Sequence, residues 1–122
     1  MKNVKKTLVL GASDNRSRYS CLAIERLKAH GHPVVAVGNK NTQVEGVEIV
    51  KIKEQFSDVD TVCLYLNPAN QKEYYDYILS LNPRRIIFNP GTENPELEGL
   101  AHDKNIHTMD ACTLVMLTTG QY

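Results

Sequence analysis

Short apolar runs alternate with segments of helical periodicity along most of this chain. The runs at residues 7–10, 34–37, 61–66 and 85–88 are each a few residues long, and the segments between them repeat apolar side chains every three or four positions. Such alternation is typical of parallel βαβ units, because an all-α or all-β chain would keep one periodicity. We therefore expect an α/β fold with three layers and a mostly parallel sheet of about five or six strands.

Three helices are expected, two between these runs and one after the last of them. The first spans residues 17–30 and ends at Gly31, which suits a helix C-terminus. Two Asn-Pro pairs, at residues 67–68 and 94–95, each place a capping side chain before a proline suited to the first helical turn. The apolar side chains expected to face the core are Cys21, Ile24, Leu27, Tyr74, Ile78, Leu81, Leu97, Leu100 and Ala101.

The remaining segments are less regular. Residues 39–46 are polar and predict a loop, followed by a weaker strand at 47–50 and a short helical turn near Phe56. A last short strand is expected at 107–109. The apolar stretch 113–117 fits a helix and a strand equally well.

Composition narrows the class of protein. The 122 residues fit one domain, residues 1–122, and 14 Lys and Arg against 14 Asp and Glu give no basic excess for nucleic-acid binding. The apolar runs fall far short of the ~20 residues of a membrane span. Cys21, Cys63 and Cys112 are odd in number and widely spaced, which argues against a disulfide framework and a zinc site. We expect a cytoplasmic protein with reduced thiols and no metal.

The segment after the first expected strand is the best candidate for a binding site. In a parallel sheet, ligands bind beyond the carboxyl ends of the strands. Here a glycine leads through small and polar residues into a helix N-terminus, where backbone N–H groups, hydroxyls and a guanidinium suit a phosphate. The alternative is an ordinary polar turn. The candidate residues are Gly11, Ala12, Ser13, Arg18 and Ser20.

The segment after the second strand indicates which nucleotide would bind. The dinucleotide fingerprint G-x-G-x-x-G has glycines where this chain has Ser13 and Arg16, which weakens the case for NAD. NAD enzymes also place an acid after the second strand, whereas this chain has Gly38, Asn39 and Lys40. A lysine there suits a phosphorylated ribose, as in coenzyme A or NADP. A solvated loop lysine explains Lys40 equally well.

Three further strand ends contribute candidates. Asn67 is expected to cap its helix first and contact a ligand second, and Asn89 follows the next strand. Gly91 allows close approach of the backbone but also fits a type II turn. Cys112 follows the last strand and is a candidate redox thiol, although a buried small residue is the alternative.

No catalytic constellation can be assembled from the sequence. The spacing of the histidines pairs none of them with a nucleophile, and no two carboxylates are placed as an acid and a base. The sequence predicts a binding edge without an evident reaction, and it leaves open whether the protein is an enzyme.

The chain resembles a known family, the small stand-alone CoA-binding domain proteins, which are related to the CoA-binding domain of the succinyl-CoA synthetase alpha subunit. The resemblance covers nearly the whole length. The residues that carry it are Gly11-Ala12-Ser13, Arg18 and Ser20, Gly31, Lys40, Val59-Asp60, Gly91, and Asp110 with Cys112. It implies a three-layer Rossmann-like domain that holds the pyrophosphate of CoA at the first loop and its adenosine end toward the second strand. It also implies ligand contacts from Gly11, Ser13, Arg18, Ser20 and Lys40.

We therefore expect a protein that binds coenzyme A or an acyl-CoA without catalysis of its own. The alternatives are an NADP-linked oxidoreductase, the nucleotide-binding subunit of an acyl-CoA ligase, and a domain that now serves only as an interaction module. A protein partner or a homo-oligomer is compatible with the sequence. The acyl group, the pathway and the oligomeric state cannot be predicted from it.

Overall fold

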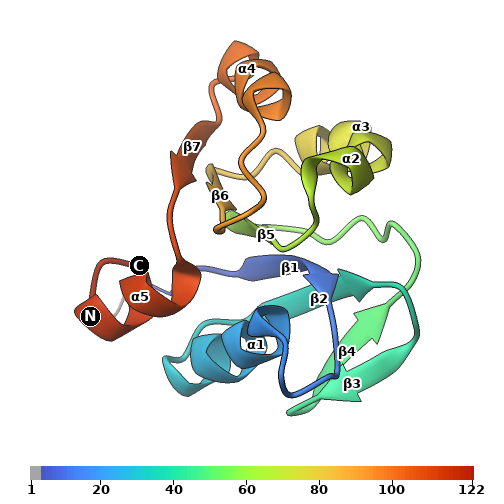
Figure 1. The fold of residues 1–122 in the computed structure, drawn as a ribbon, viewed down its shortest axis with the longest axis vertical. Helices are drawn as coiled ribbons and strands as arrows, with labels where there is room; N and C mark the ends of the chain where they lie inside the picture. The colour runs from blue at the N-terminus through green and yellow to red at the C-terminus, as the bar shows by residue number, and fades with distance from the viewer. Residues whose placement is uncertain (1–3) are drawn as a thin grey trace.

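A computed structural model, which describes residues 4–122, has one seven-stranded sheet between two layers of helices (Figure 1). The strands are β1 Thr7–Ala12, β2 Val34–Gly38, β3 Thr42–Val44, β4 Val47–Val50, β5 Thr61–Leu64, β6 Arg85–Phe88 and β7 His107–Asp110. The helices are α1 Tyr19–Ala29, α2 Pro68–Gln71, the 3₁₀ turn η1 Lys72–Tyr74, α3 Tyr75–Ser80, α4 Pro95–Asp103 and α5 Thr113–Thr119. The predicted α/β fold with a mostly parallel sheet is confirmed.

The strand order creates a switch point in the middle of the sheet. The order is β3-β4-β2-β1-β5-β6-β7, and only the β3–β4 pair is antiparallel. Along the chain, the parallel strands build outward from β1 in one direction up to β4 and then in the other direction from β5 onward. This is the order of doubly wound nucleotide-binding sheets, in which the crevice for the ligand lies where the order reverses. In this protein that place is the carboxyl end of β1, between β2 and β5.

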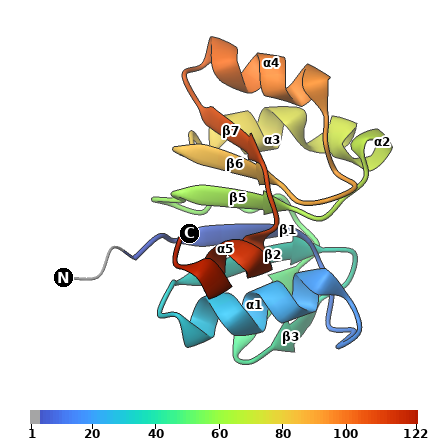
Figure 2. The ribbon, with the colours of Figure 1, turned by 60° about the vertical axis from the view of Figure 1, so that its left-hand side comes forward.

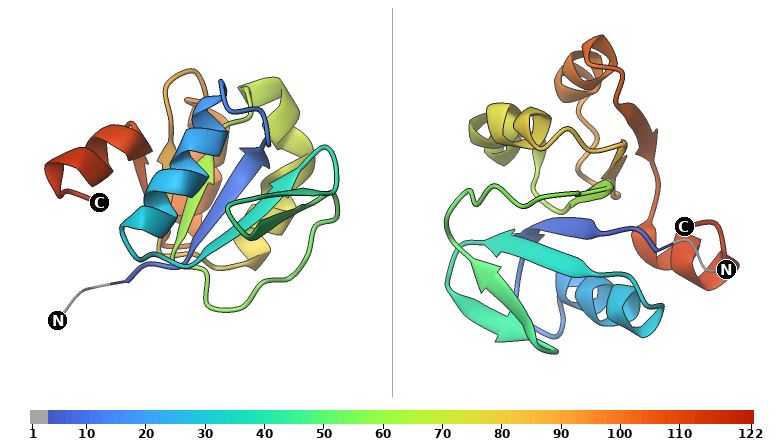
Figure 3. Two further views of the ribbon diagram at one scale, coloured as in Figure 1. Left: turned by 90° about the horizontal axis from the view of Figure 1, so that it is seen from below. Right: turned by 180° about the vertical axis from the view of Figure 1, so that it is seen from behind.

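The sheet is buried on both faces, which explains the uninterrupted apolar runs of the sequence. Leu8 and Leu10 face a cluster built on α3 and α4, and Val9 faces the opposite cluster, which α1 and α5 cover. Figures 2 and 3 show these two helical layers on opposite sides of the strands. Since successive side chains of a strand point to opposite faces, residues 8–10 of β1 pack against both helical layers.

One strand lies where a loop was predicted. β3 occupies part of 39–46 and turns back into β4 through Glu45 and Gly46, both of which have positive φ. The short β3–β4 hairpin buries Val44 and Val47 against α1. This strand raises the total to seven, above the five or six expected.

Three other local predictions need correction. The helical turn near Phe56 is absent; residues 51–60 run without helix, and Tyr77 holds this segment by donating a hydrogen bond from its hydroxyl to the Glu54 carbonyl at 2.6 Å. Leu100, predicted to be buried, is 38% exposed on α4. The helix expected after Asn67 is divided into α2, η1 and α3 by a change to 3₁₀ geometry. The ambiguous stretch 113–117 forms α5.

Within residues 4–122, no helix is both long and apolar enough to cross a membrane. The longer helices α1, α3, α4 and α5 each bury apolar side chains.

Candidate functional site

A cavity of about 880 Å³ lies over the carboxyl ends of the central strands, at the switch point. Four strand ends contribute to it: β1, β2, β5 and β6. The residues that line it are Gly11, Ala12, Ser13, Asp14, Asn15, Arg18, Tyr19, Ser20, Val37, Gly38, Asn39, Lys40, Tyr65, Leu66, Asn67, Asn70, Glu73, Tyr74, Pro90 and Thr92. Its size falls within the range of roughly 300–1,000 Å³ typical of small-molecule and cofactor sites.

Most candidates from the sequence meet in this cavity. Those that line it are Gly11, Ala12, Ser13, Arg18, Ser20, Gly38, Asn39, Lys40 and Asn67. They come from the ends of β1 and β2 and from the segments that follow β1, β2 and β5, which are neighbours in the sheet. Parallel strands end at one edge, so the three loops are brought together although they are far apart along the chain.

Asn89 and Gly91 lie outside the cavity lining. Asn89 is buried, its amide nitrogen donates to the Leu64 carbonyl at 3.2 Å, and its Oδ1 accepts from the Thr113 N–H at 2.8 Å. It therefore joins β5, β6 and the start of α5. Gly91 has φ of 91° and donates its N–H to the Glu93 carboxylate, so here it serves a turn.

The N-terminus of α1 opens into the cavity without a compensating side chain. In the described chain, the N-cap residue Arg18 makes no side-chain capping hydrogen bond, and the first turn of α1 has no acidic residue. In contrast, Asn94 caps α4 by accepting from the N–H groups of Glu96 and Leu97, and Glu96 adds a negative charge there. The partial positive charge at the N-terminus of α1 is thus not offset by a capping side chain, and at the cavity it favours an anion.

Two glycines allow the strand ends below the cavity to approach closely. A Cβ at Gly38 would lie 2.4 Å from the Ala12 carbonyl oxygen, and one at Gly11 would lie 3.0 Å from the Tyr65 carbonyl carbon. Gly11 also has φ of 90°, a conformation that favours glycine. The floor of the cavity is therefore backbone from β1, β2 and the end of β5.

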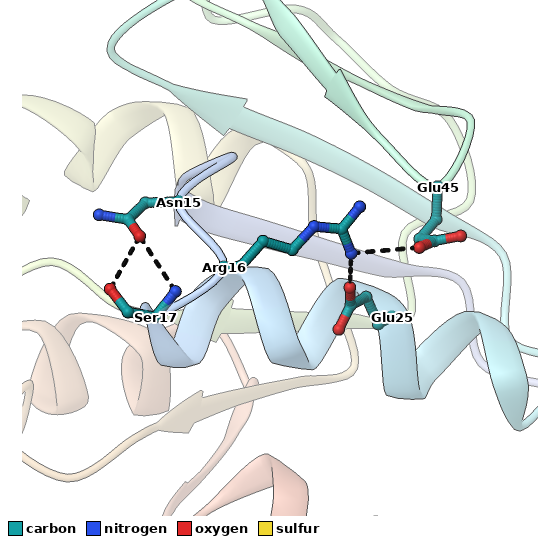
Figure 4. A network of polar contacts seen from close by, with 5 residues as sticks. All are labelled: Asn15, Arg16, Ser17, Glu25 and Glu45. Carbon is teal, nitrogen blue, oxygen red and sulfur yellow. Dashed lines mark hydrogen bonds and ion pairs between the residues drawn. The ribbon is translucent and has the colours of Figure 1, made fainter.

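The two arginines of the loop between β1 and α1 have different surroundings, and Figure 4 shows those of Arg16. Arg16 pairs with Glu25 on α1 and with Glu45 in the β3–β4 turn, at 3.2 Å from the latter. The carboxamide oxygen of Asn15 accepts from the N–H and hydroxyl of Ser17, which shapes the turn between them. Arg16 does not line the cavity, whereas Arg18 does. Arg18 is therefore the guanidinium available to a ligand.

Lys40 is held at the end of β2 by a carboxylate that sequence reasoning missed. Its Nζ lies 3.3 Å from Oδ2 of Asp14, and the same oxygen accepts a hydrogen bond from the Thr42 hydroxyl at 2.9 Å. The Thr42 hydrogen bond and then Lys40 lower the pKa of the Asp14 carboxyl. The lysine and the aspartate thus face the cavity together, each held by the other.

The half of the cavity beyond β5 was only partly predicted. Asn67 caps α2 by accepting from the Asn70 N–H at 3.0 Å, as expected. Tyr65 and Leu66 directly follow β5, so the rule of strand ends was a signal that could have found them. Glu73 and Tyr74 line the cavity from η1, and no local sequence signal marks that 3₁₀ turn.

The three thiols differ in access. Burial raises the pKa of the Cys63 thiol to about 11 and also raises the pKa of Cys21, whereas Cys112 is half-buried at the start of α5. Cys112 does not line the cavity. Among the described residues, no group of three or more His, Cys, Asp or Glu side chains is placed to hold a metal ion.

We expect a thiol reagent such as Ellman's reagent to titrate one cysteine in the native protein at pH 8, and all three after unfolding. The reactive species is the thiolate, which burial suppresses at Cys21 and Cys63. Cys112→Ser should remove the native-state reaction. Two or more fast-reacting thiols in the native wild-type protein would contradict this assignment.

Comparison with known proteins identifies the family. Residues 5–118 match the CoA binding domain family. The chain belongs to this family. The CoA binding domain therefore spans nearly all of the chain, and membership supports coenzyme A as the general class of ligand. No curated protein is similar enough to the chain to count as a match.

Solved structures agree with this CoA binding domain fold. One uncharacterized protein is 50% identical, with a TM-score of 0.96 over 99% of this chain and 100% of its own. A hypothetical protein from Pyrococcus horikoshii OT3 is 21% identical, with a TM-score of 0.82 over 95% of this chain and 83% of its own. A dinucleotide-forming acetyl-coenzyme A synthetase from Ca. Korarchaeum cryptofilum is 17% identical, with a TM-score of 0.71 over 89% of this chain but 26% of its own. The latter two share the fold.

Proposed function

We propose that this protein binds coenzyme A or an acyl-CoA in the cavity at the carboxyl edge of the sheet, without a reaction of its own. The observation that carries the proposal is the convergence of the uncompensated α1 N-terminus, Arg18 and Lys40 on one cavity. Membership of the CoA binding domain family supports the same ligand.

The charges of coenzyme A suit the arrangement of these groups. Its diphosphate would lie at the loop after β1, where the helix dipole and backbone N–H groups favour an anion and Arg18 offers a bidentate guanidinium. Its phosphorylated ribose would lie beside Lys40 at the end of β2, which is the ribose end in doubly wound sheets. The pantetheine arm would then cross the switch point toward Asn67, Asn70 and Glu73.

One observation favours NADP as a second candidate ligand: Lys40 lies at the end of β2, where a lysine suits any phosphorylated ribose. The acetyl-coenzyme A synthetase supports another role, since a domain with this fold forms part of that enzyme. In that role the present chain would supply a nucleotide site, and catalytic groups would come from a partner.

The test is thermal unfolding of the purified protein with coenzyme A, acetyl-CoA, NADP and NAD in parallel. A ligand at 100 times its dissociation constant adds about 2.7 kcal/mol to the free energy of unfolding. For a chain of this length, the unfolding midpoint should rise by on the order of 10 °C. We expect this rise with the two CoA species only. A rise with NADP alone would transfer the proposal to an oxidoreductase, and no rise with any ligand at millimolar concentration would refute it.

A further inference from the structure

The cavity contains a carboxylate at a place where an anionic ligand is proposed to bind. Asp14 comes from the loop after β1, yet its side chain lies beside Lys40 at the end of β2. Both residues line the cavity. A carboxylate there repels a phosphate, so its presence calls for a second role toward the ligand.

The contacts of Asp14 leave it able to accept another hydrogen bond. Lys40 Nζ, at 3.3 Å, and Thr42 Oγ1, at 2.9 Å, both contact Oδ2. An ionised carboxylate has about four acceptor positions, divided over its two oxygens. Lys40 and Thr42 use positions on Oδ2 and none on Oδ1. The side chain of Asp14 is 32% exposed and that of Lys40 is 63% exposed, so both groups are accessible from the cavity.

A carboxylate paired with a lysine suits a ribose that carries a free hydroxyl beside a phosphate. NAD enzymes use a carboxylate at the end of this strand to accept hydrogen bonds from ribose hydroxyls, and a cation replaces it where the ribose is phosphorylated. This protein has both groups, supplied by two different loops. The ribose of coenzyme A has one matching group for each of them, on adjacent carbons. Its free 2′-hydroxyl can donate a hydrogen bond to the carboxylate, and its 3′-phosphate can accept hydrogen bonds from the lysine.

We propose that Asp14 and Lys40 recognise one ribose together, with Asp14 accepting a hydrogen bond from the 2′-hydroxyl and Lys40 binding the 3′-phosphate. The inference rests on the proposed function and makes Asp14 a specificity-determining residue of the site. Thr42 holds the carboxylate in place through Oδ2 and leaves Oδ1 for the ligand. Lys40 partly neutralises Asp14, so the acid is tolerated beside the phosphate.

The experiment compares the dissociation constants of coenzyme A, 3′-dephospho-CoA and 2′-deoxy-CoA by titration calorimetry. We expect the wild-type protein to bind coenzyme A about tenfold more tightly than either analogue, the lower end of the effect of a hydrogen bond to a charged group. Asp14→Ala should abolish the preference for the 2′-hydroxyl and keep the preference for the 3′-phosphate. Lys40→Met should abolish the preference for the 3′-phosphate and keep the preference for the 2′-hydroxyl.

Glu48→Ala serves as the matched control, because Glu48 is an exposed carboxylate on β4 outside this cavity. It should leave both preferences unchanged. If Asp14→Ala still prefers coenzyme A over 2′-deoxy-CoA, or if the wild-type protein binds the two equally, the assignment of Asp14 is wrong while the proposed function stands. If the wild-type protein binds none of the three ligands at millimolar concentration, the proposed function fails and this inference fails with it.

Discussion

Arg18→Ala is expected to weaken the binding of coenzyme A by about 10- to 100-fold, measured by titration calorimetry at fixed ionic strength. Arg18 lines the cavity as the N-cap of α1, where a diphosphate would meet the positive end of the helix. Loss of a hydrogen bond to a charged group costs about 1.5–3 kcal/mol, which corresponds to that range of affinity. Because the side chain is exposed, the substitution should leave the free energy of unfolding nearly unchanged.

Arg16→Ala is the matched control for this prediction. It removes the same charge from the same loop, but Arg16 pairs with Glu25 and Glu45 and does not line the cavity. From outside the cavity the charge of Arg16 acts on a ligand only at long range, where salt screens it, so we expect a change in affinity of about twofold or less. An equal loss in both variants would mean that the loop attracts the ligand only by its net charge. An unchanged affinity in Arg18→Ala would refute the proposed diphosphate site.

The central sheet could be predicted because its strands are buried on both faces. A run such as that of β1 has no polar face to interrupt it, and the helices between the runs are marked by Gly31 and by the two Asn-Pro pairs. β3 could not be predicted in the same way. It has three residues and is stabilised by pairing with β4 and by Val44 packing on α1, which are tertiary contacts.

The C-terminal helix α5 shows the same limit. Its apolar residues fit the periodicity of a helix as well as that of a strand, and their tertiary contacts decide in favour of the helix. Met116 packs with Cys63 and Ile87 on the outer half of the sheet, and Leu117 joins the cluster of α1. A seven-residue helix of this kind is stabilised by its packing more than by its own propensity.

The candidate site could be predicted as far as it depends on strand ends. The loops after β1 and β2 follow their strands directly, so Gly11, Arg18 and Lys40 were placed on one edge from the sequence. The different roles of Arg16 and Arg18 could not be predicted, because they depend on where the β3–β4 turn places Glu45. The pairing of Asp14 with Lys40 also joins two loops, and Thr42 fixes it from the unpredicted strand β3.

The close approach of β1 and β2 below the cavity leads to the largest expected effect on stability. Gly38→Ala should lower the free energy of unfolding by about 1–3 kcal/mol, the range for overpacking a close-packed region. We expect the upper end, because the new methyl group would lie 2.4 Å from the Ala12 carbonyl oxygen and 2.9 Å from Ile49. The carbonyl belongs to the backbone of β1 and cannot rotate away, so β1 and β2 must separate. Urea denaturation monitored by circular dichroism measures this change.

Gly99→Ala provides a control of opposite sign for Gly38→Ala. Gly99 lies within α4, and a methyl group added there would meet no atom within 4 Å. Alanine in a helix interior is favoured over glycine by roughly 0.5–1 kcal/mol, so this variant should be slightly more stable than the wild-type protein. Gly38→Ala should also bind coenzyme A more weakly, since Gly38 lines the cavity, whereas Gly99→Ala should bind it normally. If Gly38→Ala matched Gly99→Ala in both stability and affinity, β1 and β2 would not be in contact below the cavity, and the backbone floor of the proposed site would be wrong.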